Sequence, residues 1–327
     1  MNAPAPGATG TSRADAALGV GFVLAFHTAI VTAAQSAPVL APLAAASVGA
    51  RPESVGYFTA IVFGTALLSA NGIVGLVTRL GSFLGAAAAL AMAGVGLVVL
   101  SLAETVWQVC LGAVLIGIGY GPVNPIGSRV LLKVSPPHRR NLIFSLKQSG
   151  VAIGGAIAAV ALPALALAFG WRAAVLGTFV FALVVALAAA PIRFQLGDDA
   201  EPGASIRVRG PISVGLALLW SAELRTMAVA VFTFSMAQFG FMSVYVTLLW
   251  SWLEVPPETA AALLSVLLIS SLFGRLFWGW RADSGRPQRV LFTLAWTGAF
   301  LVAGILLLSP DWPLWLAALF SAALGLG

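Results

Sequence analysis

Uninterrupted apolar runs of 18 or more residues recur along the chain, separated by short polar breaks. Such runs match the roughly 20 residues that an α-helix needs to cross the hydrocarbon core of a bilayer. In lipid only helices and closed barrels satisfy their backbone hydrogen bonds, and the alternating strands of an outer-membrane barrel are absent from the sequence. Only 9% of the residues are charged, against roughly 25% in a soluble domain. The chain is therefore predicted to be an all-α integral membrane protein.

The polar breaks divide the chain into four parts. We expect a disordered cytoplasmic tail at residues 1–15, a six-helix N-terminal bundle at 16–194, a cytoplasmic linker at 195–215 and an incomplete C-terminal bundle at 216–327. The last helix has only about 17 residues left, barely a span, so the sequence is expected to be truncated. A short surface helix is expected at 216–224. The ten membrane helices are expected at residues 16–43, 54–78, 82–103, 105–134, 141–169, 171–194, 225–252, 258–280, 287–308 and from 311 onwards.

The distribution of basic residues predicts the orientation. With the N-terminus in the cytoplasm, Arg51 and Arg172 fall in outer loops, and the other fifteen of the 17 Lys and Arg residues fall at the inner side. This is a strong positive-inside bias, as expected for a multi-pass protein of a bacterial inner membrane. The basic composition is therefore attributed to membrane topology, and no nucleic-acid partner is expected. The single cysteine, Cys110, lies in an apolar span, so neither a disulfide nor a metal site is expected.

A glycine frame occurs twice. Gly75 and Gly81 enclose five residues after the second predicted helix, and Gly279 and Gly285 enclose five residues after the eighth. The offset is 279 minus 75, or 204 residues, so six helices separate the two copies. This spacing indicates two parallel six-helix repeats.

At these positions the chain resembles the major facilitator superfamily, and its bacterial permeases in particular. The loop signature of that family is matched, with one residue fewer, after the eighth helix. The first copy is degenerate, because Arg79 stands where the family has an aspartate. The resemblance implies a fold of two pseudo-symmetric six-helix bundles, of whose twelve helices about ten are present. It also implies that the protein transports a solute by alternating access. It also implies that Asp283 helps to latch an inner gate against the start of the fifth helix. The gating residues implied are Gly75, Gly81, Gly279, Asp283, Gly285 and Arg286.

At two positions the sequence differs from the drug exporters of this family. Proton-driven drug exporters of this family carry an arginine in the fourth helix, and Ala113 occupies that position here. They also carry a Gly-Pro element in the fifth helix, but no proline precedes Gly154 and Gly155. Both departures disfavour a drug/proton antiporter.

Lys147 and His27 are the foremost candidates for solute binding. Lys147 lies seven residues after Arg140, which ends the basic turn, and so about 10 Å inside the hydrocarbon. An ammonium group at that depth is expected to attract an anion, unless its long stem carries the charge back to the interface. His27 lies about 16 Å deep, where an imidazole either binds solute, relays a proton or only bonds to a neighbouring helix.

Other polar side chains inside the spans complete the predicted lining of the pathway. Tyr120, Asn124 and Ser128 recur every four residues and form one stripe, next to prolines that interrupt their helix. Arg129 points away from this stripe, and a structural role is expected for it. The alternative for each member is plain packing between helices. The full set of predicted solute-binding residues is His27, Gln35, Tyr120, Asn124, Lys147, Gln148, Gln238 and Tyr245.

An enzyme is not expected. Paired membrane acids, metal-ligand spacings and a nucleophile with its base are missing, and only two histidines occur. The expected function is secondary active transport of a small solute, and Lys147 favours an organic or inorganic anion. We expect a monomer in the lipid bilayer that needs no cofactor. Proton coupling is a further hypothesis. The alternatives are an inactive or partial transporter and, less favoured, a drug/proton exporter.

Overall fold

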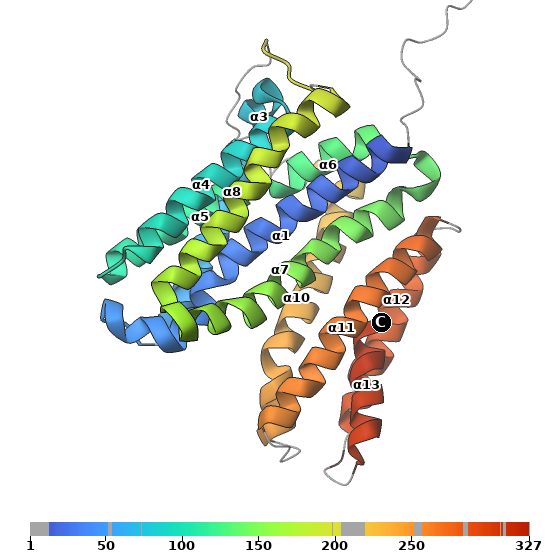
Figure 1. Ribbon diagram of the computed structural model, residues 1–327. Coiled ribbons are helices and arrows are strands. Elements are labelled where there is room, and N and C mark those ends of the chain that lie inside the picture. Colours follow the sequence, from blue (N-terminus) through green and yellow to red (C-terminus); the bar gives the residue numbers. More distant parts are fainter. Residues whose placement is uncertain are drawn as a thin grey trace, which may run out of the picture.

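Figure 1 shows the computed structural model of the protein, in which long helices run along one another. All regular structure in the described part of the chain is helical, as the apolar runs predicted. The structure describes residues 13–51, 54–72, 74–197, 199–203, 220–251, 257–283, 287–307, 309 and 312–326.

A first group of helices surrounds α1. In this group α1 packs against α7 and α8, α4 packs against α5 and α8, and α2 packs against α5. The elements are α1 (Arg13–Ala44), η1 (Ala45–Val48), α2 (Val55–Gly72), α3 (Val74–Leu80), α4 (Ser82–Ser101), α5 (Val106–Tyr120), α6 (Val123–Val134), η3 (Pro137–Arg139), α7 (Arg140–Phe169) and α8 (Trp171–Leu196).

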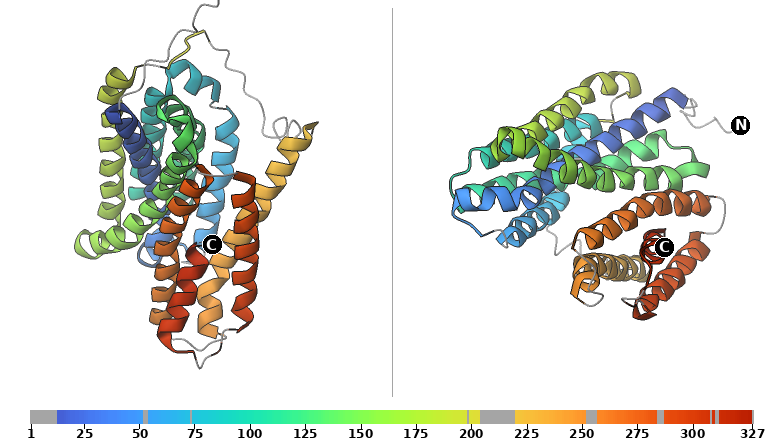
Figure 2. Two further views of the ribbon diagram at one scale, coloured as in Figure 1. Left: turned by 90° about the vertical axis from the view of Figure 1, so that its right-hand side faces the viewer. Right: turned by 60° about the horizontal axis from the view of Figure 1, so that its bottom comes forward.

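A second group is formed by the later helices. Here α11 packs against α13, α10 and α12. Figure 2 shows this orange and red group beside the first one. Its elements are α10 (Ala222–Ser251), α11 (Pro257–Asp283), α12 (Pro287–Gly304), η4 (Ile305–Leu307) and α13 (Leu314–Leu326).

Several helices are long and apolar enough to cross a bilayer, which makes the chain a multi-pass membrane protein. In the described residues six segments meet that length and composition, and two further apolar helices are shorter. The six segments are Arg13–Val48, Ser82–Ser101, Val106–Val134, Arg140–Phe169, Trp171–Leu196 and Ala262–Asp283.

The helix boundaries differ from the predicted ones at a few places. The predicted helix 105–134 is divided into α5 and α6 at Gly121 and Pro122, because a proline lacks the N–H that continues a helix. α1 begins at Arg13, inside the predicted tail. The predicted helix 287–308 ends at Gly304 and continues as the 3-10 turn η4. Most of the predicted linker 195–215 and residues 216–219 of the predicted surface helix lie outside the described residues, so the domain boundaries there stay predictions. The end of the predicted surface helix belongs instead to α10, which begins at Ala222.

Close approach between backbones holds the first group together. A Cβ atom on Gly154 of α7 would lie only 2.7 Å from the Thr28 carbonyl oxygen of α1. Between α4 and α5, a Cβ on Gly96 would lie 2.8 Å from the Gly112 carbonyl oxygen. Lipid tails are as apolar as leucine, so helices in a membrane associate mainly by such tight packing of small residues.

The two groups meet mainly where α11 packs against α7. Both helices approach each other at the end of the bundle that contains the basic turn 133–140, which we call the basic end. Figures 1 and 2 show that α7 and α11 lie together at the start of α7 and diverge towards their other ends. The contact between the groups is therefore concentrated at the basic end.

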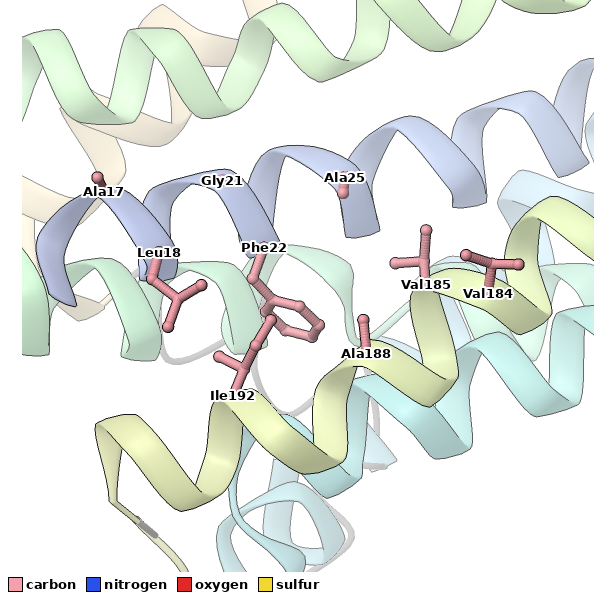
Figure 3. A pocket seen from close by; sticks show the side chains of 9 residues that line it. All are labelled: Ala17, Leu18, Gly21, Phe22, Ala25, Val184, Val185, Ala188 and Ile192. Carbon is pink, nitrogen blue, oxygen red and sulfur yellow. The ribbon is translucent and has the colours of Figure 1, made fainter. Parts of the chain in front are cut away.

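A groove of about 340 Å³ lies between α1 and α8 (Figure 3). Every side chain that lines it is apolar, so it has no group that would bind a polar solute. The lining residues are Ala17, Leu18, Gly21, Phe22, Ala25, Val184, Val185, Ala188 and Ile192.

Candidate functional site

Lys147 and Asn124 meet inside the first group of helices. The Lys147 side chain, on α7, is only 4% exposed, and its Nζ donates a hydrogen bond of 2.8 Å to the Asn124 Oδ1 of α6. Gly127, one turn further along α6, leaves room for the lysine stem, since a Cβ there would lie 3.4 Å from the Lys147 Cδ. Asn124 lies nine residues before Lys133, about 14 Å along α6. The ammonium is thus held within the membrane span and not carried back to the basic end.

His27 lies next to this pair. It is 2% exposed on α1, and a Cβ on Gly150 of α7 would lie 3.0 Å from the His27 Cβ. Gly150 is one turn after Lys147, and the Lys147 charge has an electrostatic effect on His27. Within the described part of the chain, the His27 Nδ1 is buried without a hydrogen-bond partner. The structure thus brings together three predicted residues from three helices: His27, Asn124 and Lys147.

Thr32 was not among the predicted residues, yet it ties α1 to α7 beside this cluster. Its hydroxyl donates to the Thr28 carbonyl at 2.8 Å and to the Gly154 carbonyl at 3.2 Å. A signal was present, because Thr28 and Thr32 are four residues apart and share one face of the helix. Gln35, one turn further, is exposed.

The other predicted solute-binding residues have different surroundings. The Tyr120 ring packs edge-on against Phe63, with 5.4 Å between the ring centroids. Gln148 has an exposed side chain. Tyr245 is buried in the second group, where its hydroxyl lies 2.6 Å from the Ser321 Oγ, and the Gln238 side chain lies outside the described part. Solute binding by these residues stays a prediction, and in this conformation the Tyr245 hydroxyl is occupied by a contact between helices.

The contact between the two groups is built on successive turns of α11. The Asp283 carboxylate accepts hydrogen bonds from the backbone N–H groups of Asn141 and Leu142, at 2.9 and 2.8 Å, and from the Asn141 side-chain amide. A carboxylate at this position offsets the positive end of the helix dipole and satisfies N–H groups that have no partner within the helix. This is the contact that the family resemblance implied for Asp283. Its gating role remains a prediction.

Two further turns of α11 continue the interface. Gly279 faces Ser145 so closely that a Cβ on the glycine would meet the serine side chain. One turn earlier, the Arg275 guanidinium donates to the Gln148 carbonyl oxygen at 3.3 Å. These contacts lie on the face of α7 that points away from Lys147. Gly285 and Arg286, also predicted for the gate, lie outside the described residues.

The first copy of the glycine frame is stabilised in another way. Gly75 lies in α3, and Gly81 adopts a positive φ of 81° before α4, a conformation that favours glycine. A carboxylate from a later part of the chain, that of Asp199 after α8, binds where this loop ends. Asp199 accepts hydrogen bonds from the Ser82 backbone N–H at 2.6 Å and from the Ser82 hydroxyl.

Arg129 connects Asp199 to the end of α3. Its Nε lies 3.3 Å from the Asp199 carboxylate, and it donates to the Thr78 hydroxyl at 2.9 Å. Partial burial raises the pKa of Asp199, but the Ser82 hydrogen bonds and the Arg129 charge outweigh it and hold the pKa below its ordinary value. The structural role expected for Arg129 is thus defined by its partners. Asp199 was missed because nothing in the sequence joins it to a loop more than a hundred residues earlier.

Comparisons with known proteins agree with this architecture. The profile of the Major Facilitator Superfamily matches residues 18–327. A similar solved structure is a crystal structure of the Escherichia coli fucose:proton symporter FucP, with a single asparagine-to-alanine substitution. It has a TM-score of 0.64 and 14% sequence identity, and the match covers 94% of this chain and 81% of that chain. At this identity the likeness concerns the fold. No curated protein matches the sequence.

The apolar spans, the two helix groups joined at α7 and α11, and the profile match over nearly the whole chain lead to one conclusion. The protein belongs to the Major Facilitator Superfamily and has the fold of its secondary transporters.

Proposed function

We propose that this transporter moves a small anion and that Lys147 is its principal contact with that solute. The proposal is based on the environment of the Lys147 ammonium, which is buried and hydrogen-bonded to the neutral amide of Asn124. Among the residues that the structure describes, no carboxylate lies within 4.0 Å of it. A buried charge without a counter-charge costs several kcal/mol. An anion would offset that cost.

Access and selectivity support the same solute class. Asn124 is exposed on α6, so a solute that reaches this face meets the amide that holds Lys147. His27 adds an imidazole to the cluster, which contains no acidic side chain in the described residues. A cationic solute would therefore meet a positive charge and no carboxylate. Alternating access would proceed by rearrangement at the contact between α7 and α11. The positive-inside bias of the basic residues supports a location in a bacterial inner membrane with the N-terminus in the cytoplasm.

The test is uptake into proteoliposomes that contain the purified protein. The panel holds labelled monocarboxylates, dicarboxylates, nitrate, cyanate, L-fucose as a neutral sugar, and an organic cation. We expect uptake of at least one anion, and Lys147→Ala should reduce that uptake at least a hundredfold, since a buried charge-assisted contact is worth about 3 kcal/mol. The expected loss should appear without a change in membrane insertion.

The sequence offers a matched control, because Lys133 and Lys147 are its only lysines. Lys133 lies at the basic end, where its Nζ donates to the Gly197 carbonyl oxygen. Lys133→Ala should keep the affinity for the anion. Unchanged kinetics for Lys147→Ala, or uptake of L-fucose alone, would contradict the proposed anion.

A further inference from the structure

His27 has a property that anion binding by Lys147 does not explain. Its Nδ1 is buried and has no hydrogen-bond partner in the described residues, whereas such groups in folded proteins are nearly always bonded. A ring nitrogen in this position is able to take up a proton. Histidine is also the side chain that ordinarily changes charge near neutral pH.

The charged surroundings of His27 are simple. Of the helices packed against α1, α7 supplies Lys147, whose charge acts on His27. The charged groups of α6 are Arg129 and Lys133, which bond to residues 197–201 at the basic end. α8 carries Arg193 near its last turn and, at its other end, Arg172, which donates to the Ala103 carbonyl oxygen. α5 contributes Tyr120 and no charged side chain, and Asn124 of α6 is neutral. No described carboxylate faces His27.

Protonation of His27 and anion binding must therefore favour each other. With the site empty, a proton on His27 would put a second positive charge beside the Lys147 ammonium, and the two charges would repel each other. An anion at Lys147 offsets that repulsion, so the proton binds more readily when the anion is present. By linkage, a protonated His27 strengthens anion binding by the same factor.

We infer that His27 is the proton carrier of an anion:proton symport, in which one proton on the His27 Nδ1 travels with each anion at Lys147. This inference rests on the proposed function. The proton is taken up from one side of the membrane, forms an N–H bond with the buried imidazole and is released to the other side with the solute. For a monovalent anion the cycle moves no net charge, and for a divalent anion it moves one negative charge.

The experiment measures exchange and accumulation of an anion separately in proteoliposomes. The anion used is one that the wild-type protein exchanges. Counterflow of labelled against unlabelled anion needs no net proton movement. Uptake driven by a pH gradient of one unit should concentrate a monovalent anion about tenfold if one proton accompanies it. His27→Gln, which keeps a polar side chain of similar size, should keep counterflow and lose the gradient-driven accumulation. His138→Gln replaces the only other histidine and should behave as the wild type.

Each outcome is informative. A wild-type protein that exchanges the anion without taking up protons, recorded by a pH-sensitive dye inside the vesicles, overturns the symport and leaves the proposed function intact. Full accumulation by His27→Gln overturns the role of His27. Loss of counterflow by a well-folded His27→Gln would overturn the proton-carrier role and make His27 a solute contact instead. If the variant does not fold, the dye recording on the wild-type protein decides whether symport occurs. Absence of anion exchange in the wild type contradicts the proposed function itself.

Discussion

The carboxylate of Asp283 lies at the first turn of α7, where it accepts hydrogen bonds from both the backbone N–H and the side-chain amide of Asn141 at 2.9 Å. The bond joins the last residue of α11 to a helix of the other group, so it closes the contact between the groups at the basic end. α11 cannot move away from the start of α7 without breaking these hydrogen bonds.

Removal of this charge should loosen that contact. Asp283→Asn loses the interaction with the helix dipole, which is worth about 1 kcal/mol at an exposed site and corresponds to about a fivefold change in population. Ser145, which faces Gly279, reports the opening when it is replaced by cysteine in a Cys110→Ala background. Maleimide labelling at that cysteine should accelerate about fivefold in Asp283→Asn. Glu104→Gln, a change at the opposite end of the bundle, should leave the rate unaltered, and equal rates in all three proteins would show that Asp283 is not a latch.

The packing of α1 against α7 predicts a contrast between adjacent glycines. A Cβ on Gly154 would lie 2.7 Å from the Thr28 carbonyl oxygen, whereas a Cβ on Gly155 would meet nothing within 4 Å. Gly154→Ala should therefore destabilise the protein by about 1 to 3 kcal/mol through overpacking, and Gly155→Ala should not. The melting temperature in detergent, followed by fluorescence-detected gel filtration, should fall by a few degrees only for the first variant. Similar melting temperatures for both would mean that α1 does not approach α7 so closely.

Arg129 should matter for stability and not for solute binding. Arg129→Ala leaves the Thr78 hydroxyl and the Asp199 carboxylate without their shared donor, at a cost of about 1 to 3 kcal/mol. We expect a lower melting temperature with an unchanged KM for the anion. Within the described residues Arg79 makes one hydrogen bond, to the Pro202 carbonyl oxygen, so Arg79→Ala is the milder comparison. A large rise in KM in Arg129→Ala would instead place this residue in the solute pathway.

Asp199 makes stability depend on pH in a defined direction. Its pKa in the folded protein lies below the ordinary value, so its contribution is complete above the ordinary carboxyl pKa of about 4 and is lost as the pH falls through the lower, folded-state pKa. The difference in melting temperature between wild type and Asp199→Asn should thus be largest near pH 7 and shrink towards pH 3. A difference that does not change over this range would rule out the ionised carboxylate as the source of the stabilisation.

Much of the helical architecture followed from local properties of the sequence. Length and hydrophobicity of a segment decide whether it spans a bilayer, which is why α1, α4, α7 and α8 lie close to their predicted ranges. The division of the predicted helix 105–134 also had a local cause in Pro122. The loop around Arg79 lacks the aspartate of the family signature, but nothing local predicted that Asp199 would bind at Ser82.

The candidate site depended on more than local pattern. Lys147 and His27 were singled out because charged and titratable groups are costly inside a membrane, and Asn124 because of its periodic stripe. Nothing in the sequence showed that these three would meet, or that Tyr245 would be bonded to Ser321 on another helix.

The amino-acid sequence was sufficient to predict a bundle of membrane-spanning helices with one strongly basic end, because those properties depend on the composition of each segment alone. Which polar groups share a site became clear from the packing of the helices, since the contacts that matter join residues far apart along the chain. Lys147 meets Asn124 across 23 residues, Ser82 meets Asp199 across 117, and Asn141 meets Asp283 across 142. Such contacts depend on how whole helices pack, through glycines that allow backbones to approach closely.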